Sequence, residues 1–519
     1  MSDATITFIV LGAAVVVFVW DRLPVAIVAL GVALSLWATG VLDLEQALAG
    51  FGDPAVIFVA SLFVVSEGLD AAGVTAWAGR ELGGRAGDSH ARLIALMLLL
   101  VAALSAVVTP NASVAALVPV TVVLAIRAGR PPSKLLLPLA FGAHAGSLLA
   151  LTGSPVNVVA SEAAARAGVG GFGFFSFAVA GVPLLAGTIA IVALWGERLL
   201  PHRAARSITR DFSSHARTLI EQYELDHPED ALLTRASGVA EVVIPPRSDL
   251  AGERVFAGMV TDSGDLVVLG VQRAGEDIAG ESELAVGDTL LLQGAWSDLD
   301  RHLDSEDLLA VDPPALMRRA VPLGHGAKRA IAVLLTMVVL LAAGVVPPAA
   351  AGLLAAGALV LLGVVGIEQA YRSVSWTTVI LLAAMFSLST ALISSGAAKQ
   401  LADQLVDVVG GAGPYALLAG LFVFTVTLGQ LISNIATALV VIPIAISAAA
   451  DMDVSAKPVL MAVTVSAAAS FLTPVATPAN LMVMEPGGYR FGDYWKLGLP
   501  LLALFGVVAV LLVPVFWPF

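Results

Sequence analysis

The stretch "LTGSPVNVVASE" (residues 151–162) decides the fold, because it interrupts an apolar segment with Gly153, Pro155 and the polar Asn157. A second stretch of the same kind, "VATPANLMVMEP" (475–486), stands near the other end of the chain. Backbone that leaves helical geometry inside a bilayer strands N–H and C=O groups, and it is tolerated only inside protein or beside a wet cavity. We therefore predict that the two stretches are broken membrane helices that form a binding site.

Composition places most of the chain in a membrane. Of its 519 residues, 58% are hydrophobic and only 13% are charged, whereas soluble domains carry about a quarter charged residues. Several apolar stretches reach the roughly 17–25 residues that a spanning helix needs. The first, Thr5 to Trp20, lacks a basic leader and a small-residue cleavage site, so we predict a span and not a signal peptide. The absence of cysteine excludes disulfides, thiolate metal sites and cysteine nucleophiles.

The chain contains an internal repeat. A shift of 323 residues superimposes uncommon residues of the first half on identical residues of the second. The matches include Pro24 with Pro347, Glu45 with Glu368, Asn111 with Asn434, Lys134 with Lys457, Ser147 with Ser470, and Asn157 with Asn480. Matches of Asn, Glu and Lys in one register are not expected by chance in so apolar a sequence.

Each half offers five crossings. In the first half they lie near 5–20, 24–40, 54–69, 134–167 (interrupted) and 177–198, with a re-entrant hairpin over 91–127. Because five is odd, the halves would have opposite orientations. Lys and Arg cluster in the connections on one side, and the positive-inside rule makes that side cytoplasmic. The predicted protein is an all-α polytopic protein of the plasma (inner) membrane with both termini outside. It is an inverted repeat of five spans plus one re-entrant hairpin per half.

A polar segment separates the halves. The predicted domains are membrane repeat 1 (1–200), a cytoplasmic α+β insert (201–325, core 240–312) and membrane repeat 2 (326–519). We expect strands at "AEVVIPP" (240–246), "GDLVVLGVQR" (264–273) and "GDTLLLQG" (287–294), separated by Gly/Asp turns. The charged stretch 207–237 is predicted to be helical or loose.

Four interruptions carry the candidate site: the hairpin tips at 109–113 and 433–437, and the unwound stretches at 152–157 and 473–480. Gly153 and the prolines would free carbonyls for a hard cation such as Na+, and half-helix N-termini favour an anion. The polar candidates in these segments are Asn111, Ser154, Asn157, Asn434, Thr477 and Asn480. Each tip is expected beside the unwound stretch of its own half. The alternative is that the polar residues only join helices and that Gly and Pro only kink them.

Other polar residues give weaker signals. His144 has Ala467 as its counterpart, so it is either a buried, hydrogen-bonded histidine or a substrate or proton-coupling contact. Glu162 and Glu485 are either proton carriers or the ends of short helices. Since the four interruptions contain no acidic residue, neutral oxygens holding Na+ are favoured over H+ coupling.

These motifs resemble those of a transporter family. "SNIATALVVIP" (433–443) resembles the Ser-Asn-Thr tip signature of the divalent anion:Na+ symporters in the ion transporter superfamily, and "GSPVN" and "ATPAN" resemble its unwound-helix motifs. The last part of repeat 2 resembles the subgroup that includes sulfate permeases. "VIPPRSDLAGERV" and "GDTLLLQG" resemble a TrkA-C (RCK-C) module.

The resemblance implies an elevator-type carrier with a scaffold and a mobile transport domain, and a homodimer. It implies Na+ at the tips and loops, on Asn111, Gly153, Ser433, Asn434 and Ala476. It also implies an anion between the tips. The predicted substrate-binding residues are Asn111, Ser113, Ser154, Asn157, Ser433, Asn434, Thr437, Thr477 and Asn480. The first tip departs from the pattern, because Pro110 stands where Ser433 stands in the second.

We therefore expect a secondary active transporter that couples Na+, or alternatively H+, to a small divalent anion such as sulfate or a dicarboxylate. The insert would bind a small regulatory ligand or mediate assembly, and it lacks a Gly-rich dinucleotide fingerprint. The alternative is a cation (K+-linked) transporter or channel gated by the RCK-like insert, which would need a filter sequence that is absent. No metal-ligand cluster or nucleophile–base motif supports an enzyme, and we expect neither an organic cofactor nor a nucleic-acid partner.

Overall fold

The computed structural model describes residues 2–20, 22–75, 77–78, 81, 90–127, 130–203, 237–261, 263–273, 276–278, 280–303, 307–311, 326–409, 412–474 and 476–519. Most of these residues are helical. The helices of the first half are α1 (Asp3–Trp20), α2 (Val25–Ala38), α3 (Leu44–Leu48), α4 (Pro54–Ala71), α6 (His90–Val107), α7 (Pro110–Arg127), α8 (Leu136–Gly146), α9 (Pro155–Arg166) and α10 (Ala178–Leu199). Short 3₁₀ turns occupy Ala49–Gly52, Pro132–Lys134 and Leu151–Gly153.

The second half repeats this order. Its helices are α15 (Ala327–Ala342), α16 (Pro348–Leu361), α17 (Ile367–Ser373), α18 (Trp376–Ser394), α19 (Ala397–Val409), α20 (Pro414–Gly429), α21 (Asn434–Asp451), α22 (Ala456–Ala468), α23 (Pro478–Met484), α24 (Tyr494–Val507) and α25 (Val513–Phe516). A 3₁₀ turn (Phe491–Asp493) precedes α24, and a π-helical turn (Val508–Leu512) follows it. Among the described residues, five helical segments are long and apolar enough to cross a membrane, and several shorter apolar helices accompany them.

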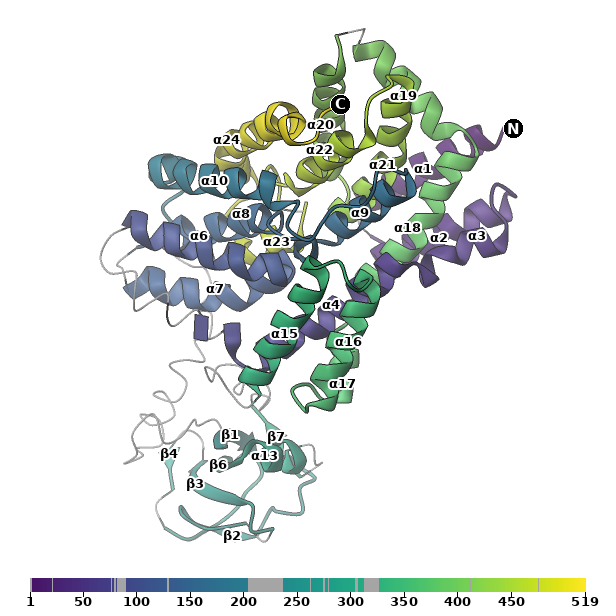
Figure 1. Ribbon diagram of the computed structural model, residues 1–519. Coiled ribbons are helices and arrows are strands. Elements are labelled where there is room, and N and C mark those ends of the chain that lie inside the picture. The colour runs from purple at the N-terminus through teal and green to yellow at the C-terminus, as the bar shows by residue number, and fades with distance from the viewer. Residues whose placement is uncertain are drawn as a thin grey trace.

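The helices pack in two groups, each of which mixes the two halves (Figure 1). In the first helix group, α2 packs on α18 and α4 packs on α16, while α1 and α15 cover α2 and α16. The second helix group contains α6 to α10 and α20 to α24, and it meets the first group where α18 packs on α21 and α4 packs on α9. Within the second group, α9 packs on α21 and α22, and α23 packs on α7 and α8. Each half thus completes the packing of the other.

The sequence repeat is also a repeat of contacts. Gly181 in α10 lies so close to the backbone that a Cβ there would be 2.2 Å from the carbonyl oxygen of Leu148. Gly498 in α24 is in the same position against Phe471, at 2.3 Å. Leu148 and Phe471 are related by the shift of 323 residues. The absence of a side chain at both glycines lets the helix approach the backbone just after the break.

The insert is a small sheet domain. The strands β1 (Ser237–Val243), β3 (Leu266–Arg273) and β6 (Thr289–Ala295) are the centre of an antiparallel sheet, and they confirm the three predicted strands. The short strands β4 (Glu276–Asp277) and β7 (Leu309–Ala310) complete the order β4-β3-β6-β1-β7, and β2 (Arg254–Val255) pairs with β5 (Ser282–Glu283). Helix α13 (Trp296–His302) packs against β1 and β6. The charged stretch 207–237 falls outside the described residues, apart from its last one.

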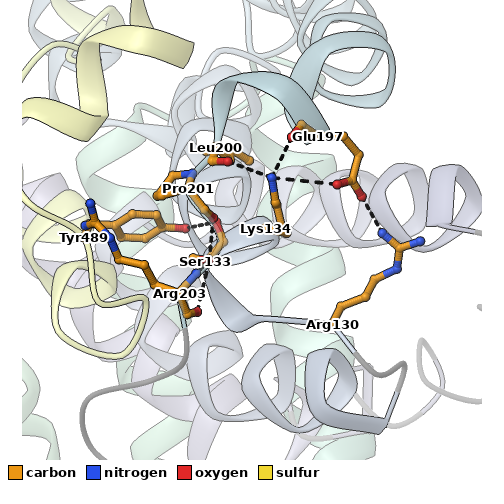
Figure 2. Close-up of polar contacts among 8 residues, drawn as sticks. All are labelled: Arg130, Ser133, Lys134, Glu197, Leu200, Pro201, Arg203 and Tyr489. Atoms are coloured by element: carbon orange, nitrogen blue, oxygen red, sulfur yellow. Dashed lines mark hydrogen bonds and ion pairs between the residues drawn. The ribbon is translucent and has the colours of Figure 1, made fainter.

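A buried polar cluster holds the end of α10, where the chain leaves for the insert (Figure 2). Lys134 is only 2% exposed, and its Nζ donates to the carbonyls of Glu197 (2.7 Å) and Leu200 (2.6 Å). A cation is favoured at this helix C-terminus, whose last carbonyls lack partners. Ser133 donates to the carbonyl of Pro201 at 2.7 Å, and Arg203 pairs with Asp493 at 2.6 Å.

The same cluster joins the two halves. The Tyr489 hydroxyl donates to the carbonyl of Ser133 and accepts from the backbone N–H of Leu137 at 2.9 Å. We call Arg130, Ser133, Lys134, Glu197, Leu200, Pro201, Arg203 and Tyr489 the junction cluster. It fixes the start of α8 and the end of α10 to the loop between α23 and α24.

The close approach at the two glycines generates a stability prediction. Gly181→Ala and Gly498→Ala should each lower the free energy of unfolding by about 1–3 kcal/mol or more, because the added methyl collides with a backbone carbonyl that cannot move freely. Gly31→Ala in α2 is the control, since a Cβ there meets nothing within 4 Å and alanine favours a helix. Thermal unfolding of the purified protein measures all three, and equal stability of the three variants would contradict the repeat geometry.

The insert depends on a buried carboxylate. Asp288 is fully buried and accepts from Arg273 at 2.8 and 2.7 Å and from the backbone N–H of Ala285 at 2.8 Å. The hydrogen bonds from Arg273 hold the pKa of Asp288 below its usual range. The stability that this difference contributes is complete above the unfolded pKa of about 3.9 and is lost as the pH falls through the lower folded pKa.

Asp288→Asn should therefore destabilise the insert at neutral pH by about 1.5–3 kcal/mol, the range for hydrogen bonds to charged groups. Hydrogen exchange of the β3 and β6 amides in the full chain provides the measurement. Glu283→Gln is the control, because its pair with Arg254 is solvent-exposed on both sides and contributes at most about 1 kcal/mol. Exchange rates that respond alike in both variants would refute the role of Asp288.

Candidate functional site

The two breaks lie slightly earlier in the chain than the sequence predicts. Helix α8 ends at Gly146 and α9 begins at Pro155, while α22 ends at Ala468 and α23 begins at Pro478. The irregular stretches are therefore 147–154 and 469–477, in place of 152–157 and 473–480. Ser154 and Thr477 are the N-caps, each followed by proline at the first helical position, a position where proline needs no N–H partner.

Asn157 and Asn480 lie in the first turn after each break and fold back over it. The Asn157 side-chain amide donates to the carbonyls of Ser147 (2.8 Å) and Ala150 (2.9 Å). The Asn480 amide donates to the carbonyls of Ser470 (2.8 Å) and Thr473 (3.1 Å), which are the same positions in the repeat. Both asparagines are completely buried. Each amide thus satisfies two carbonyls that the break frees.

The hairpin tips are tight. Only Val108 and Thr109 separate α6 from α7, so Asn111 lies in the first turn of α7. Ser433 caps α21 by accepting from the backbone N–H of Ala436 at 3.3 Å, and Asn434 is the first residue of that helix. Both asparagines are therefore at helix N-termini, where backbone N–H groups are free of intrahelical partners.

Each tip lies beside the break of its own half, as predicted. In the second half, the Ser470 hydroxyl donates to Asn434 Oδ1 at 2.9 Å, and Gln430 Oε1 accepts from the N–H of Leu472 at 3.2 Å. In the first half, the Thr152 hydroxyl donates to the carbonyl of Ala106 at 2.7 Å.

Two further contacts join the halves, and the sequence did not predict them. Asn111 Oδ1 accepts from the backbone N–H of Ala479, at the start of α23, at 3.2 Å. His144 Nε2 lies 3.1 Å from the hydroxyl of Thr477. The first tip, His144 and the second break therefore meet at one place. His144 is buried and hydrogen-bonded, as one of the two alternatives expected.

Buried polar atoms without a hydrogen-bond partner gather at these segments. Five of the eight such atoms among the described residues belong to a tip, a break or the turn that follows it: Ser113 Oγ, Asn157 Oδ1, Thr437 Oγ1, Thr473 Oγ1 and Asn480 Oδ1. An unpartnered buried polar group is costly and calls for a ligand, an ion or water. All five are oxygens that can accept or coordinate.

The remaining predicted residues lie in the same region. Gly153 packs so closely under Ser147 that a Cβ would be 2.2 Å from the Ser147 carbonyl oxygen. Ala476 is buried in the second break. Glu162 lies away from the breaks, in the later part of α9, where it contacts Arg166 at 3.4 Å.

A signal in the sequence would have located the site at once. The chain contains only four asparagines, and they are Asn111, Asn157, Asn434 and Asn480. The roles of Gln430, Ser470 and Thr473 depend on how the hairpin meets the break, and no pattern in the sequence indicates them.

A cavity of 280 Å³ reaches the first tip. It lies between α4 and the hairpin α6–α7, and Val108, Ala112 and Ser113 line its inner end. Ser66, Glu67, Asp70 and Thr75 line the part near the end of α4. Ser113, whose hydroxyl is buried and unpartnered, thus lies at the wall of the cavity.

Comparisons with known proteins agree with this architecture. Residues 15–466 match the model of the citrate transporter (CitMHS) family. The chain is 29% identical to the uncharacterized transporter YfbS of Escherichia coli, over 98% of both chains. It is 25% identical to sodium/sulfate cotransporter 1 of Chlamydomonas reinhardtii, over 56% of this chain and 34% of that protein.

A solved structure supports the fold. The YdaH transporter of Alcanivorax borkumensis, described as having an unusual topology, superimposes with a TM-score of 0.50 over 97% of this chain and 99% of that one, at 14% identity. Its likeness concerns the fold alone. Since the family model covers most of the sequence and the apolar helices suit a multi-pass membrane protein, the chain belongs to the citrate transporter family, a family of the ion transporter superfamily.

Proposed function

We propose that this transporter couples Na+ to the movement of a small divalent anion, sulfate or a dicarboxylate, at the place where tips and breaks meet. The observation that carries the proposal is the gathering of unpartnered buried oxygens at these segments. The distant sodium/sulfate cotransporters named among the relatives support the choice of ions.

Na+ fits the available oxygens. Sodium is a hard cation and prefers neutral or charged oxygen ligands, as calcium and magnesium do. The amides of Asn157 and Asn480 are occupied with the carbonyls of the breaks, so their free Oδ1 atoms can only accept. Thr437, Thr473 and the carbonyls of Gly153 and Ala476 would add oxygens, with Ser433, Asn434 and Asn111 at the tips. Among the described residues, no group of three or more His, Asp or Glu suits a metal ion, so neutral donors would hold the cation.

The anion would bind to the N-terminal turns. Helices α7, α9, α21 and α23 all begin at a tip or a break, and helix N-termini attract anions through free N–H groups and the helix dipole. Ser113, Ser154, Ser433, Thr437 and Thr477 are hydroxyl residues in or next to these turns. His144 contacts Thr477 and can titrate, so we assign it to substrate contact or proton coupling.

The two helix groups suggest the transport movement. We assign the first group as scaffold and the second as the mobile transport domain of an elevator, because tips and breaks all belong to the second group. The repeat would be inverted across the bilayer, with the insert cytoplasmic and both termini outside, in line with the loop charges. The insert, a TrkA-C-like module in this proposal, would bind a regulatory ligand or join two copies in a homodimer.

Substitution of the tip asparagines tests the site. Asn434→Ala and Asn111→Ala should each raise the Na+ concentration for half-maximal uptake by about 10- to 100-fold, the loss typical of residues that position a metal ligand, or abolish uptake. Purified protein in liposomes, given labelled sulfate, succinate or citrate under separate Na+ and pH gradients, provides the measurement.

The matched control is Gln46→Ala, which removes a side-chain amide from an exposed helix cap far from the tips. It should transport like the unmodified protein. Na+-driven uptake that persists unimpaired in both asparagine variants would refute the assigned site. Uptake driven only by the pH gradient would replace Na+ by H+ as the coupling ion.

A further inference from the structure

An ion pair joins the two helix groups at one end of α4. Asp53 caps α4, with Oδ1 accepting from the N–H of Ala55 at 2.9 Å, and its second oxygen pairs with Arg166 at the end of α9. The Arg166 guanidinium also lies 5.7 Å from the ring centre of Phe386 in α18. Asp53 and Phe386 belong to the first helix group, whereas Arg166 belongs to the second.

One partner of the pair is buried, because Asp53 is buried whereas the Arg166 side chain is half-exposed. Asp53 is only 8% exposed, so separation from Arg166 would leave a largely buried carboxylate without its counter-charge. Loss of one partner of a buried pair is strongly unfavourable because the other charge stays desolvated. Separation therefore requires Asp53 to gain water or another cation.

The structure has two related cavities, and the pair lies at only one of them. The first cavity, between α4 and α6–α7, includes Ser66 and Glu67. The second, of 220 Å³, lies between α9, α18 and α21 and includes Ser389 and Thr390, the repeat counterparts of those two residues. Arg166 and Phe386 line the second cavity.

The cavities differ in what they reach. The first extends to Ala112 and Ser113 at the first tip. The second reaches α21 only from Leu439 onward, beyond the second tip at 433–437. Asp53 and Asp70 stand at opposite ends of α4, which is 18 residues long and so about 27 Å in length. The Asp70 side of the first cavity and the ion pair therefore lie toward opposite ends of α4.

We propose that Asp53 and Arg166 form a latch that holds the helix groups in the arrangement seen, in which the first cavity extends to the first tip from the Asp70 side and the second cavity stops short of the second tip. The latch must separate when the groups move to expose the site on the other side. The separation of the latch rests on the proposed function, whereas the ion pair itself is seen in the structure.

Because the chain contains no cysteine, a single introduced cysteine can be labelled specifically with a thiol reagent. Ala116 lines the first cavity, so Ala116→Cys should react with a membrane-impermeant maleimide applied on the Asp70 side. Asp53→Asn keeps a capping side chain and removes the charge, and Arg166→Gln removes the partner. Each should slow this labelling by about tenfold or more, because loss of a buried counter-charge shifts the population away from the latched arrangement.

The control is Glu162→Gln, which removes the other carboxylate near Arg166 but breaks a contact within α9 only. It should leave the labelling rate unchanged, and Arg166→Lys should restore part of the rate lost in Arg166→Gln. Unchanged labelling in both latch variants, or an equal change in Glu162→Gln, would overturn the proposal. If the latch variants label more slowly but the protein transports neither Na+ nor the anions in liposomes, the latch would be supported and the proposed function refuted.

Discussion

The structure depends on how a broken helix satisfies its backbone inside a membrane. Each break frees carbonyls that lipid cannot solvate, and in both halves a single asparagine side chain bridges two of them. The side-chain amide of asparagine has two N–H donors for the two carbonyls, and the side chain is short enough to fold back over one turn. These hydrogen bonds hold the irregular backbone in one conformation, and they also position the oxygen atoms around it.

The helices of the two halves pack against each other, so residues of both halves contribute to the site. Because α23 packs against α7 and α8, the start of α23 meets the first tip and His144. Because α9 packs against α21 and α22, the first half also packs on the helix that begins at the second tip. A site assembled in this way needs both halves. The two tips are not identical, because Pro110 stands at the position that Ser433 has in the second half.

Much of this could be predicted from the sequence, and the failures have physical reasons. Asn, Glu and Lys in one register located the repeat, the breaks and the pairing of each tip with its own break. The predicted breaks lie too late in the chain, because Asn157 and Asn480 belong to the helices that follow and not to the irregular backbone. The pairs Ser154-Pro155 and Thr477-Pro478, as cap and first helical residue, mark the true helix starts. The contacts of Asn111 with Ala479 and of Asp53 with Arg166 are between helices distant in sequence, so no local pattern contains them.

The junction cluster has a consequence for the insert. Lys134 and Ser133 hold residues 197–203 against the helical body through contacts that involve no residue of the sheet domain. On the other side, Arg329 at the start of α15 donates to the carbonyl of Leu362 at 2.9 Å and fixes the re-entry point. The helical part therefore holds both ends of the insert through its own contacts. A different domain, or a short loop, could replace the insert between residues 203 and 326 while these contacts stay in place.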